Sequence, residues 1–175
     1  MTSAPSVDLA AIQAVLLDVD GVLTDGRVGY GGGPDEIKFF DIKDGHGLKL
    51  CLRAGLQVGI LSGRVSAANQ RRAAELGLSF CIQGAKDKLA AFETFLAERH
   101  LEGRNCLYVA DDLIDLPVMR RAAVAVAVAD AVAEVRAAAT WVTQAPGGRG
   151  AVREVCEWLL KRQNKWNALV ERYDR

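Results

Sequence analysis

AVLLDVDGVLTDG, residues 14–26, is the segment of the sequence that best indicates the fold. Residues 14–19 are apolar apart from Asp18, which is typical of a short strand buried on both faces of a parallel sheet. Asp20-Gly21 and Thr24-Asp25-Gly26 follow, and both are typical of turns. The segment therefore predicts a buried strand whose carboxyl end carries two aspartates.

Strand-like and helix-like segments alternate along the rest of the chain. Apolar runs predict strands at residues 56–61, 78–82, 106–110, 124–128 and 141–143. Helical spacing predicts helices at 45–54, 66–76, 87–99, 131–138 and 151–163, with a short one after Leu116-Pro117. Residues 27–41 indicate a hairpin with a glycine-rich tip (Gly31–Pro34), and 164–175 a polar tail or helix extension. This alternation predicts an α/β fold with three layers and a mostly parallel sheet, in one domain over residues 1–175.

Composition and charge narrow the class of protein further. Half of the 175 residues are hydrophobic, a quarter are charged and the formal net charge is zero, so no nucleic-acid or membrane partner is expected. Residues 1–10 lack the pattern of a signal peptide, and no apolar run reaches the roughly 18 residues that span a bilayer. The four cysteines form no CxxC or Cys/His pattern, which favours free thiols over a zinc site. We therefore expect a cytoplasmic protein.

Polar residues gather where the predicted strands end. In an open parallel sheet, ligands bind beyond the carboxyl ends of the strands. Taken alone, each residue there has the bland interpretation of a turn, cap or solvated residue, but together they bring several acids and one lysine to one edge. The candidates are Asp18 and Asp20 after the first strand, Ser62 and Gly63 after the second, Lys88 after the third, and Asp111 and Asp112 after the fourth.

These residue types suit a magnesium ion and a phosphate group. Carboxylates without histidine or thiolate favour Mg²⁺, and the cation relieves repulsion between crowded acids. Ser62, Gly63 and Lys88 supply hydroxyl, backbone N–H and ammonium donors for phosphate. The spacing Asp18-x-Asp20 lets one carboxylate attack phosphorus while the other serves as general acid and then general base. The sequence therefore predicts a Mg²⁺-dependent phosphatase.

The same residues resemble the motifs of a known superfamily. DVDGVLT (18–24) matches the DxDGxxT signature of the haloacid dehalogenase (HAD) phosphohydrolases, which implies a Rossmann-like HAD fold. Ser62, Lys88 and residues 111–115 follow in the order of that superfamily's other motifs. From about residue 15 to 163 the chain is similar to one member family, the 3-deoxy-D-manno-octulosonate (KDO) 8-phosphate phosphatases. The segments that carry this closer resemblance are KDGHG (43–47), QG (83–84), DDLIDLPVM (111–119) and GGRGAVRE (147–154).

The resemblance implies hydrolysis of KDO 8-phosphate through an aspartyl-phosphate, as a step of lipopolysaccharide biosynthesis. It makes Asp18 the nucleophile, Asp20 the acid/base whose backbone carbonyl also binds Mg²⁺, and Asp111 the third metal ligand. Ser62, Gly63 and Lys88 would hold the phosphoryl group. The predicted substrate contacts are Asp20, Ile42, Lys43, Asp44, Gly45, Lys49, Arg64 and Arg72, with Asp112 and Asp115 as supporting residues.

The chain departs from the family pattern at three positions. Ala110 stands where glycine is usual, which requires a backbone without positive φ. His46 replaces a common aromatic residue. Lys49 stands where arginine is frequent, and a lysine cannot copy a bidentate guanidinium contact.

A cap domain does not fit between the predicted motifs, so the site needs other cover. The resemblance implies a homotetramer in which hairpins 27–41 associate and cover adjacent sites. The alternative is that the apolar side chains of the hairpin pack on their own core. The tail from Asn164 either reaches a neighbouring site or is an exposed, frayed helix.

Two other classes of protein share some of these features. A signalling receiver domain also gathers acids, Mg²⁺ and a lysine, but its acceptor aspartate lies on a middle strand, where this chain has Ser62. A non-catalytic assembly module has no physical need for clustered acids. Among phosphatases, a nine-carbon sugar-acid 9-phosphate is the alternative substrate, and Arg64 favours the eight-carbon acid by resemblance.

Overall fold

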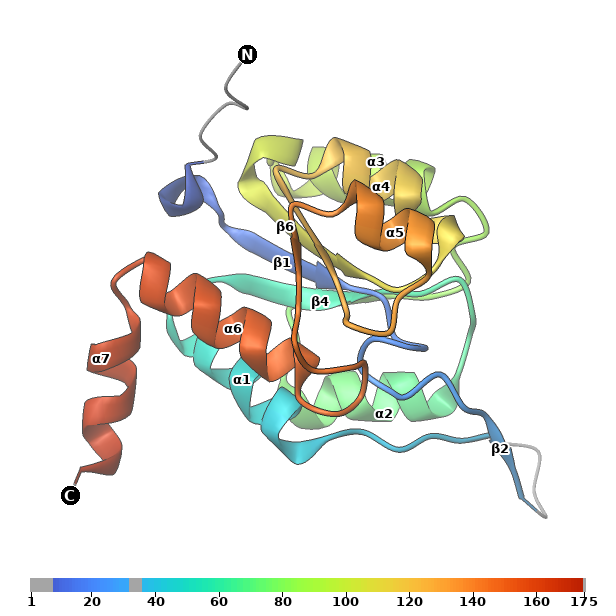
Figure 1. Cartoon of the computed structure of the whole chain (residues 1–175), viewed down its shortest axis with the longest axis horizontal. Coiled ribbons are helices and arrows are strands. Elements are labelled where there is room, and N and C mark those ends of the chain that lie inside the picture. The colour runs from blue at the N-terminus through green and yellow to red at the C-terminus, as the bar shows by residue number, and fades with distance from the viewer. Residues whose placement is uncertain (1–7, 32–35, 175) are drawn as a thin grey trace.

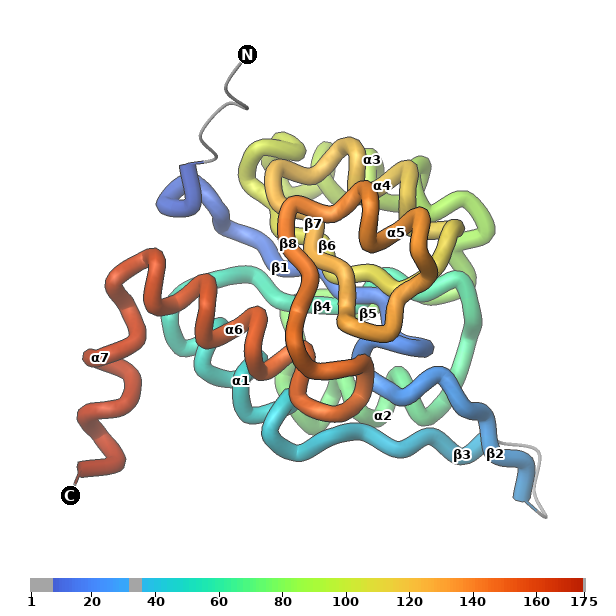
Figure 2. Tube along the Cα trace, in the orientation of Figure 1, coloured from blue at the N-terminus to red at the C-terminus, as the bar shows by residue number. Residues whose placement is uncertain are grey.

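The computed structural model describes residues 8–31 and 36–174. Its centre is a six-stranded sheet of order β5-β4-β1-β6-β7-β8, and all neighbouring strands pair in parallel (Figures 1 and 2). The strands are β1 (Ala14–Leu17), β4 (Gln57–Leu61), β5 (Phe80–Ile82), β6 (Cys106–Ala110), β7 (Val124–Ala127) and β8 (Trp141–Val142). The predicted α/β fold is confirmed.

Helices cover both faces of the sheet and form the two outer layers. One face carries α3 (Lys88–Arg99), α4 (Leu116–Arg121) and α5 (Ala133–Ala138), and the other carries α1 (Ile42–Arg53), α2 (Ala67–Leu76) and α6 (Ala151–Arg162) (Figure 1). Short 3₁₀ turns lie at Leu9–Ala11, Gly103–Asn105, Leu113–Asp115 and Glu171–Tyr173. The sheet is therefore buried on both sides, as its continuous apolar strands require.

Strand β1 lies in the middle of the sheet and brings the predicted motifs together. Its residues are at most 1% exposed, and it pairs with β4 on one side and β6 on the other. The Asp18 N–H donates to the Val109 carbonyl at 3.1 Å, which extends this pairing past the end of β1. Because parallel strands end at the same edge, the residues after β1, β4 and β6 become neighbours.

The hairpin predicted at residues 27–41 is present, and its two strands are short. Strands β2 (Gly29–Tyr30) and β3 (Glu36–Ile37) pair antiparallel and form a separate two-stranded sheet. Most of the predicted glycine-rich tip (Gly31–Pro34) falls within residues 32–35, which lie outside the described residues. The hairpin projects from the body of the protein beside α2 (Figure 2).

Helix α1 begins earlier than its apolar spacing predicts. Asp41 is the N-cap, and its carboxylate accepts hydrogen bonds from the backbone N–H groups of Lys43 and Asp44. Such a cap satisfies the free N–H groups of a first turn. Residues 42–45, which the family resemblance predicts to contact the substrate, therefore form the first turn of a helix rather than a loop.

The C-terminal segment forms a second helix rather than a straight extension of α6. Asn164 has a φ of 56°, and after it α7 (Trp166–Val170) runs back beside α6 and α1 (Figure 1). The Tyr173 hydroxyl lies 3.0 Å from Nε2 of His46 and accepts a hydrogen bond from Arg53 Nη1 at 2.8 Å. The tail thus contacts α1 of its own chain.

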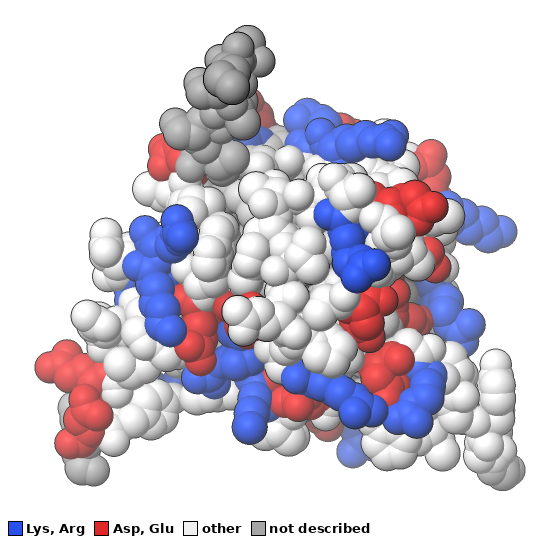
Figure 3. All heavy atoms as spheres, viewed as in Figure 1, with Lys and Arg blue, Asp and Glu red and all other residues white. Residues whose placement is uncertain are grey.

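The surface is mixed in charge, with exposed apolar side chains near the hairpin. In Figure 3, cationic and anionic side chains are interspersed over the described residues of the visible face. Tyr30 and Phe39 are 84% and 77% exposed. Within residues 8–31 and 36–174, no helix has the length and apolar character needed to cross a bilayer.

Candidate active site

A small cavity of about 130 Å³ lies where β1, β4 and β6 end. Segments that are far apart in the sequence meet there, and most of the residues that line it were predicted from the sequence. They are Asp18, Asp20, Ser62, Gly63, Arg64, Asp111, Asp112 and Ile114. The predicted edge of the sheet therefore brings the candidate nucleophile, acid/base and phosphate contacts into one site.

Asp18 is a buried carboxylate held by a buried lysine. Its Oδ1 lies 2.8 Å from Nζ of Lys88, and the two side chains are 7% and 2% exposed. Burial raises the pKa of Asp18 to about 6; the charge of Asp115 raises it too, and Lys88 opposes both. Lys88 therefore keeps a buried carboxylate more acidic than burial alone would leave it.

Lys88 is shared between two carboxylates. Besides Asp18, its Nζ contacts Oδ1 of Asp115 at 2.7 Å, and the Tyr108 hydroxyl donates to the same oxygen at 2.6 Å. Burial by itself would lower the pKa of Lys88, but the carboxylates of Asp18 and Asp115 raise it overall. Lys88 stays charged in the closed environment where it would meet a phosphoryl group.

Tyr108 is a site residue that the sequence analysis missed. It lies on β6, is fully buried and orients Asp115, which in turn holds Lys88. The sequence does contain a signal for it, a single tyrosine within the apolar strand CLYVA (106–110). A buried hydroxyl needs a hydrogen-bond partner, so such a tyrosine indicates a polar group nearby.

Asp111 completes an acidic cluster that fits a divalent cation. One carboxylate oxygen each from Asp18, Asp111 and Asp115 lie within 4.8 Å of one another. Asp111 Oδ1 is buried and has no hydrogen-bond partner among the described residues. Gly21 makes room for Asp111, since a Cβ at Gly21 would lie 2.0 Å from Asp111 Oδ2. Hard oxygen donors with an unpaired buried oxygen suit Mg²⁺.

The repulsion within this cluster is visible in the pKa of Asp111. Burial, and then the charges of Asp18 and Asp115, raise it from the ordinary value of 3.8 to about 8. The folded protein without a cation therefore binds a proton at Asp111 that the unfolded chain releases above about pH 4. Folding then becomes less favourable as the pH rises from about 4 to about 8.

We expect this linkage to appear in thermal unfolding of the metal-free protein. The unfolding temperature should fall as the pH rises from 5 to 8, and saturating Mg²⁺ should raise it more at pH 8 than at pH 5, because the cation binds the ionised carboxylates. Asp111→Asn should flatten the slope and reduce the effect of Mg²⁺. An equal effect of Mg²⁺ at both pH values in the wild type would contradict the assignment.

Asp20 is held by cations from two other segments. Its Oδ1 lies 2.6 Å from Nζ of Lys38, and its Oδ2 lies 3.5 Å from Nε of Arg64. Lys38 also contacts Glu36 Oε1 at 3.2 Å, and Arg64 pairs with the other oxygen of Glu36. Lys38 and Glu36 were missed because the hairpin was interpreted through its apolar residues alone.

Ser62 and Gly63 occupy the turn after β4. The Ser62 N–H donates to the Ile82 carbonyl at 2.9 Å, and its Oγ accepts a hydrogen bond from the Arg64 N–H at 3.2 Å. A Cβ at Gly63 would meet its nearest atom only at 3.7 Å, so the site does not require glycine on steric grounds. The turn presents a hydroxyl and the guanidinium of Arg64 to the cavity.

The remaining predicted substrate contacts lie away from this cavity. Ile42, Lys43 and Lys49 lie on α1, and none of them lines it. Ile42 is 76% exposed. Whether these three residues meet a substrate remains a prediction of the family resemblance.

Asp44, another predicted substrate contact, has a structural role in the fold. Its side chain is buried, and its two carboxylate oxygens accept hydrogen bonds from the N–H groups of Gly150 at 3.2 Å and Arg153 at 2.7 Å. It therefore satisfies free N–H groups at the start of α6 and joins α1 to that helix. Burial raises its pKa to about 6.

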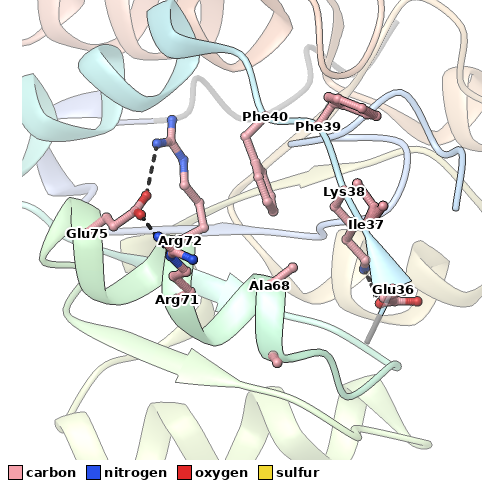
Figure 4. A pocket seen from close by; sticks show the side chains of 10 residues that line it. Glu36, Ile37, Lys38, Phe39, Phe40, Ala68, Arg71, Arg72 and Glu75 are labelled. Carbon is pink, nitrogen blue, oxygen red and sulfur yellow. Dashed lines mark hydrogen bonds and ion pairs between the residues drawn. The ribbon is translucent and has the colours of Figure 1, made fainter. Parts of the chain in front are cut away.

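Gly45 and Arg72 contact each other on the other side of α1. A Cβ at Gly45 would lie 2.3 Å from Arg72 Nη2, which donates to the Asp41 carbonyl at 3.2 Å. The guanidinium lies 5.6 Å from the centre of the Phe40 ring. Arg72 lines a different, larger cavity of about 490 Å³ between the hairpin and α2 (Figure 4).

The fold accommodates two of the three departures from the family pattern, Ala110 and His46. Among the described residues, positive φ outside glycine occurs only at His100 and Asn164. The backbone of Ala110 therefore has no positive φ, as a residue with a side chain at this position requires. His46 contacts Tyr173 of the tail. Supporting residue Asp112 caps the turn at Leu113–Asp115 by accepting from the Leu113 N–H.

Comparisons with known proteins identify first the class and then the family. No protein-family model matches the chain. A HAD superfamily (subfamily III A) hydrolase from Legionella pneumophila has a similar structure, with a TM-score of 0.90 and 38% identity over 95% of this chain and 92% of that one. The fold, the DxD motif and the acidic cluster thus define a HAD superfamily hydrolase.

Two further relatives share one name. The 3-deoxy-D-manno-octulosonate 8-phosphate phosphatase KdsC of Escherichia coli (strain K12) is 44% identical over 88% of this chain and 82% of its own length. The corresponding phosphatase of Moraxella catarrhalis, solved with a magnesium ion, a phosphate ion and KDO, has a TM-score of 0.91 and 39% identity, covering 94% of this chain and 95% of that one. The chain belongs to the family of 3-deoxy-D-manno-octulosonate 8-phosphate phosphatases. The predicted resemblance is confirmed, and the members of this family are phosphoric monoester hydrolases.

Proposed function

We propose that this protein hydrolyses KDO 8-phosphate to KDO and inorganic phosphate with Mg²⁺ as its cofactor. The observation that carries the proposal is the buried cluster in which Lys88 holds Asp18 while Asp111 lies within reach of the same cation. The Moraxella catarrhalis relative, which holds magnesium, phosphate and KDO, supports both the cofactor and the sugar.

In the proposed reaction Asp18 attacks phosphorus and Asp20 moves the proton. A carboxylate oxygen of Asp18 forms a bond to phosphorus as the bond from phosphorus to the sugar oxygen breaks, and Asp20 gives its proton to that oxygen. Asp20 then removes a proton from water, which attacks phosphorus and releases phosphate from Asp18. Each residue ends in its starting state.

The other residues of the site bind and orient the phosphoryl group. Bound Mg²⁺, held by Asp18, Asp111 and the Asp20 carbonyl, would neutralise charge on the phosphoryl oxygens. Lys88, Ser62 and the Gly63 N–H would contact the same oxygens as donors. Positioning and charge stabilisation of this kind supply most of the acceleration in phosphoryl transfer.

The sugar acid would extend from the cavity toward Arg64. The side chain of Arg64 is 51% exposed, and its guanidinium reaches both Asp20 and Glu36. A guanidinium binds a carboxylate in a bidentate manner. Both candidate sugar acids carry a carboxylate, so this contact suits either of them. Arg64 favours the eight-carbon acid by the family resemblance, while a nine-carbon sugar-acid 9-phosphate stays the second candidate.

We further propose that a homotetramer of this single-domain chain covers the open site. The exposed apolar side chains of Tyr30, Ile37 and Phe39 support the hairpin as the oligomerisation element. The tail at 164–175 is the second candidate element, and its contacts with His46 and Arg53 would have to open for it to reach a neighbour. We infer a cytoplasmic enzyme that supplies KDO for lipopolysaccharide biosynthesis.

A phosphate-release assay over a panel of sugar phosphates tests the function. KDO 8-phosphate should give the largest kcat/KM, above the nine-carbon acid 9-phosphate and neutral hexose 6-phosphates. EDTA should stop turnover and excess Mg²⁺ restore it. Greater kcat/KM on a neutral sugar phosphate would reject the proposed substrate, and turnover that EDTA leaves unchanged would reject the metal.

A further inference from the structure

Lys38 directly follows strand β3 of the hairpin. Its side chain is buried although the hairpin projects from the protein. Its side chain is 0% exposed, and its Nζ lies 2.6 Å from Asp20 Oδ1 and 3.2 Å from Glu36 Oε1. A buried ammonium is costly unless it is paired. Lys38 is therefore retained in this position by its two carboxylate partners.

The alternation of an extended strand explains how Lys38 arrives there. Side chains along a strand point in turn to opposite faces. Ile37 and Phe39 are 48% and 77% exposed, whereas Lys38 between them is buried. Figure 4 shows the ion pair of Lys38 with Glu36, and Phe40 pointing toward Ala68 of α2. One face of this segment is thus apolar and open, and the other carries the pair that meets Asp20.

We propose that Lys38 is a positioning residue for Asp20. From the hairpin, Lys38 holds the acid/base carboxylate of Asp20 in the orientation that proton transfer to the sugar oxygen needs. The proposal rests on the phosphatase function above. Lys38 does not line the cavity of the catalytic aspartates, whereas Asp20 does. It therefore acts on the reaction through Asp20 rather than by contact with the substrate.

The geometry assigns different work to the two oxygens of Asp20. Lys38 donates to Oδ1, and a carboxylic acid protonated on one oxygen still accepts on the other. Oδ1 can therefore keep this contact in both protonation states of Asp20. That leaves Oδ2, the oxygen near Arg64 of the cavity, to give and take the proton.

Substrates with different leaving groups separate this role from phosphate binding or folding. The alcohol oxygen of a sugar phosphate needs a proton as it leaves, but p-nitrophenolate does not. For both, kcat/KM reports steps through transfer to Asp18. Lys38→Met should lower kcat/KM about 10²-fold on the best sugar phosphate of the panel and less than about 3-fold on p-nitrophenyl phosphate. Lys161→Met, an exposed lysine on α6, is the matched control and should change neither.

A second set of variants tests whether the effect passes through Asp20. In an Asp20→Asn background, adding Lys38→Met should cost less than about 3-fold more on the sugar phosphate, because the group that it positions is already absent. In Lys38→Met, Glu36 keeps its pair with Arg64. The double variant K38M/E36Q, which also removes the second carboxylate partner of Lys38, is measured in parallel. It should show the same split between substrates.

The outcomes separate this proposal from the function on which it rests. Equal loss on both substrates, no loss on either, or a full effect of Lys38→Met in the Asp20→Asn background would overturn the role of Lys38 alone. A wild-type protein that hydrolyses neither substrate would remove the phosphatase function, and the role of Lys38 with it.

Discussion

Asp18→Asn should abolish phosphate release while leaving the protein folded. The amide is nearly the same size as the carboxylate and its oxygen can still accept from Lys88, which now lies 2.8 Å from Asp18 Oδ1. An amide cannot form the acyl-phosphate bond, so kcat should fall by about 10⁴-fold or more.

The covalent intermediate gives this variant a second measurement. Acid quenching of the wild type during turnover should trap a phosphorylated chain, detected as added mass on the peptide that contains residue 18. The Asn variant should show none. Phosphate release within 10-fold of the wild type, or a trapped phosphate on another residue, would disqualify Asp18 as the nucleophile.

Asp87→Asn is the matched control for this exchange. Asp87 is the N-cap of α3, next to Lys88, and accepts a hydrogen bond from the Ala90 N–H at 3.0 Å. Asparagine caps helices about as well as aspartate. This control carries the same chemical change beside the site and should keep both activity and stability.

Lys88→Met should damage activity and stability together. Methionine fills the space but leaves Asp18 and Asp115 buried side by side without their shared cation. Removing one partner of a buried pair costs about 3–5 kcal/mol, and the repulsion left behind raises the pKa of Asp18 further, so that less of it is ionised for attack. We expect kcat/KM to fall about 10³-fold or more, with a lower midpoint in urea unfolding without Mg²⁺.

Two further variants separate these effects. Lys88→Met/Asp115→Asn should recover part of the stability, since one of the two unpaired carboxylates is gone, but none of the activity. Lys86→Met removes an exposed lysine two residues earlier and should be neutral in both measurements. Recovery of activity in the double variant would show that Lys88 serves folding rather than the phosphoryl group.

The site joins two energetic requirements that act against each other. Burial, and then repulsion between the clustered acids, raises the pKa of both Asp18 and Asp111. Lys88 relieves part of this repulsion from one side, and a divalent cation would relieve it from the other. Burial of these charges lowers the stability of the metal-free fold, and binding of a cation to the folded state would raise that stability again.

The sequence by itself determined the parallel sheet and the place of the site. Apolar runs of strand length predict buried strands wherever they end up in the fold, and in a parallel sheet the residues that follow them share one edge. Asp18, Ser62, Lys88 and Asp111 could therefore be assigned to one cluster before any coordinates. Local motifs sufficed because backbone pairing, rather than side-chain detail, brings these residues together.

Only the tertiary structure decided which partners those residues have. Lys38 reaches Asp20 because the chain that leaves the projecting hairpin after β3 passes beside the turn that follows β1, and Tyr108 reaches Asp115 because a 3₁₀ turn follows β6. Asp44 proved to be a link to α6, through backbone groups more than 100 residues away in the chain. Contacts of this kind depend on the packing of one element against another, and no periodicity within a single segment encodes them.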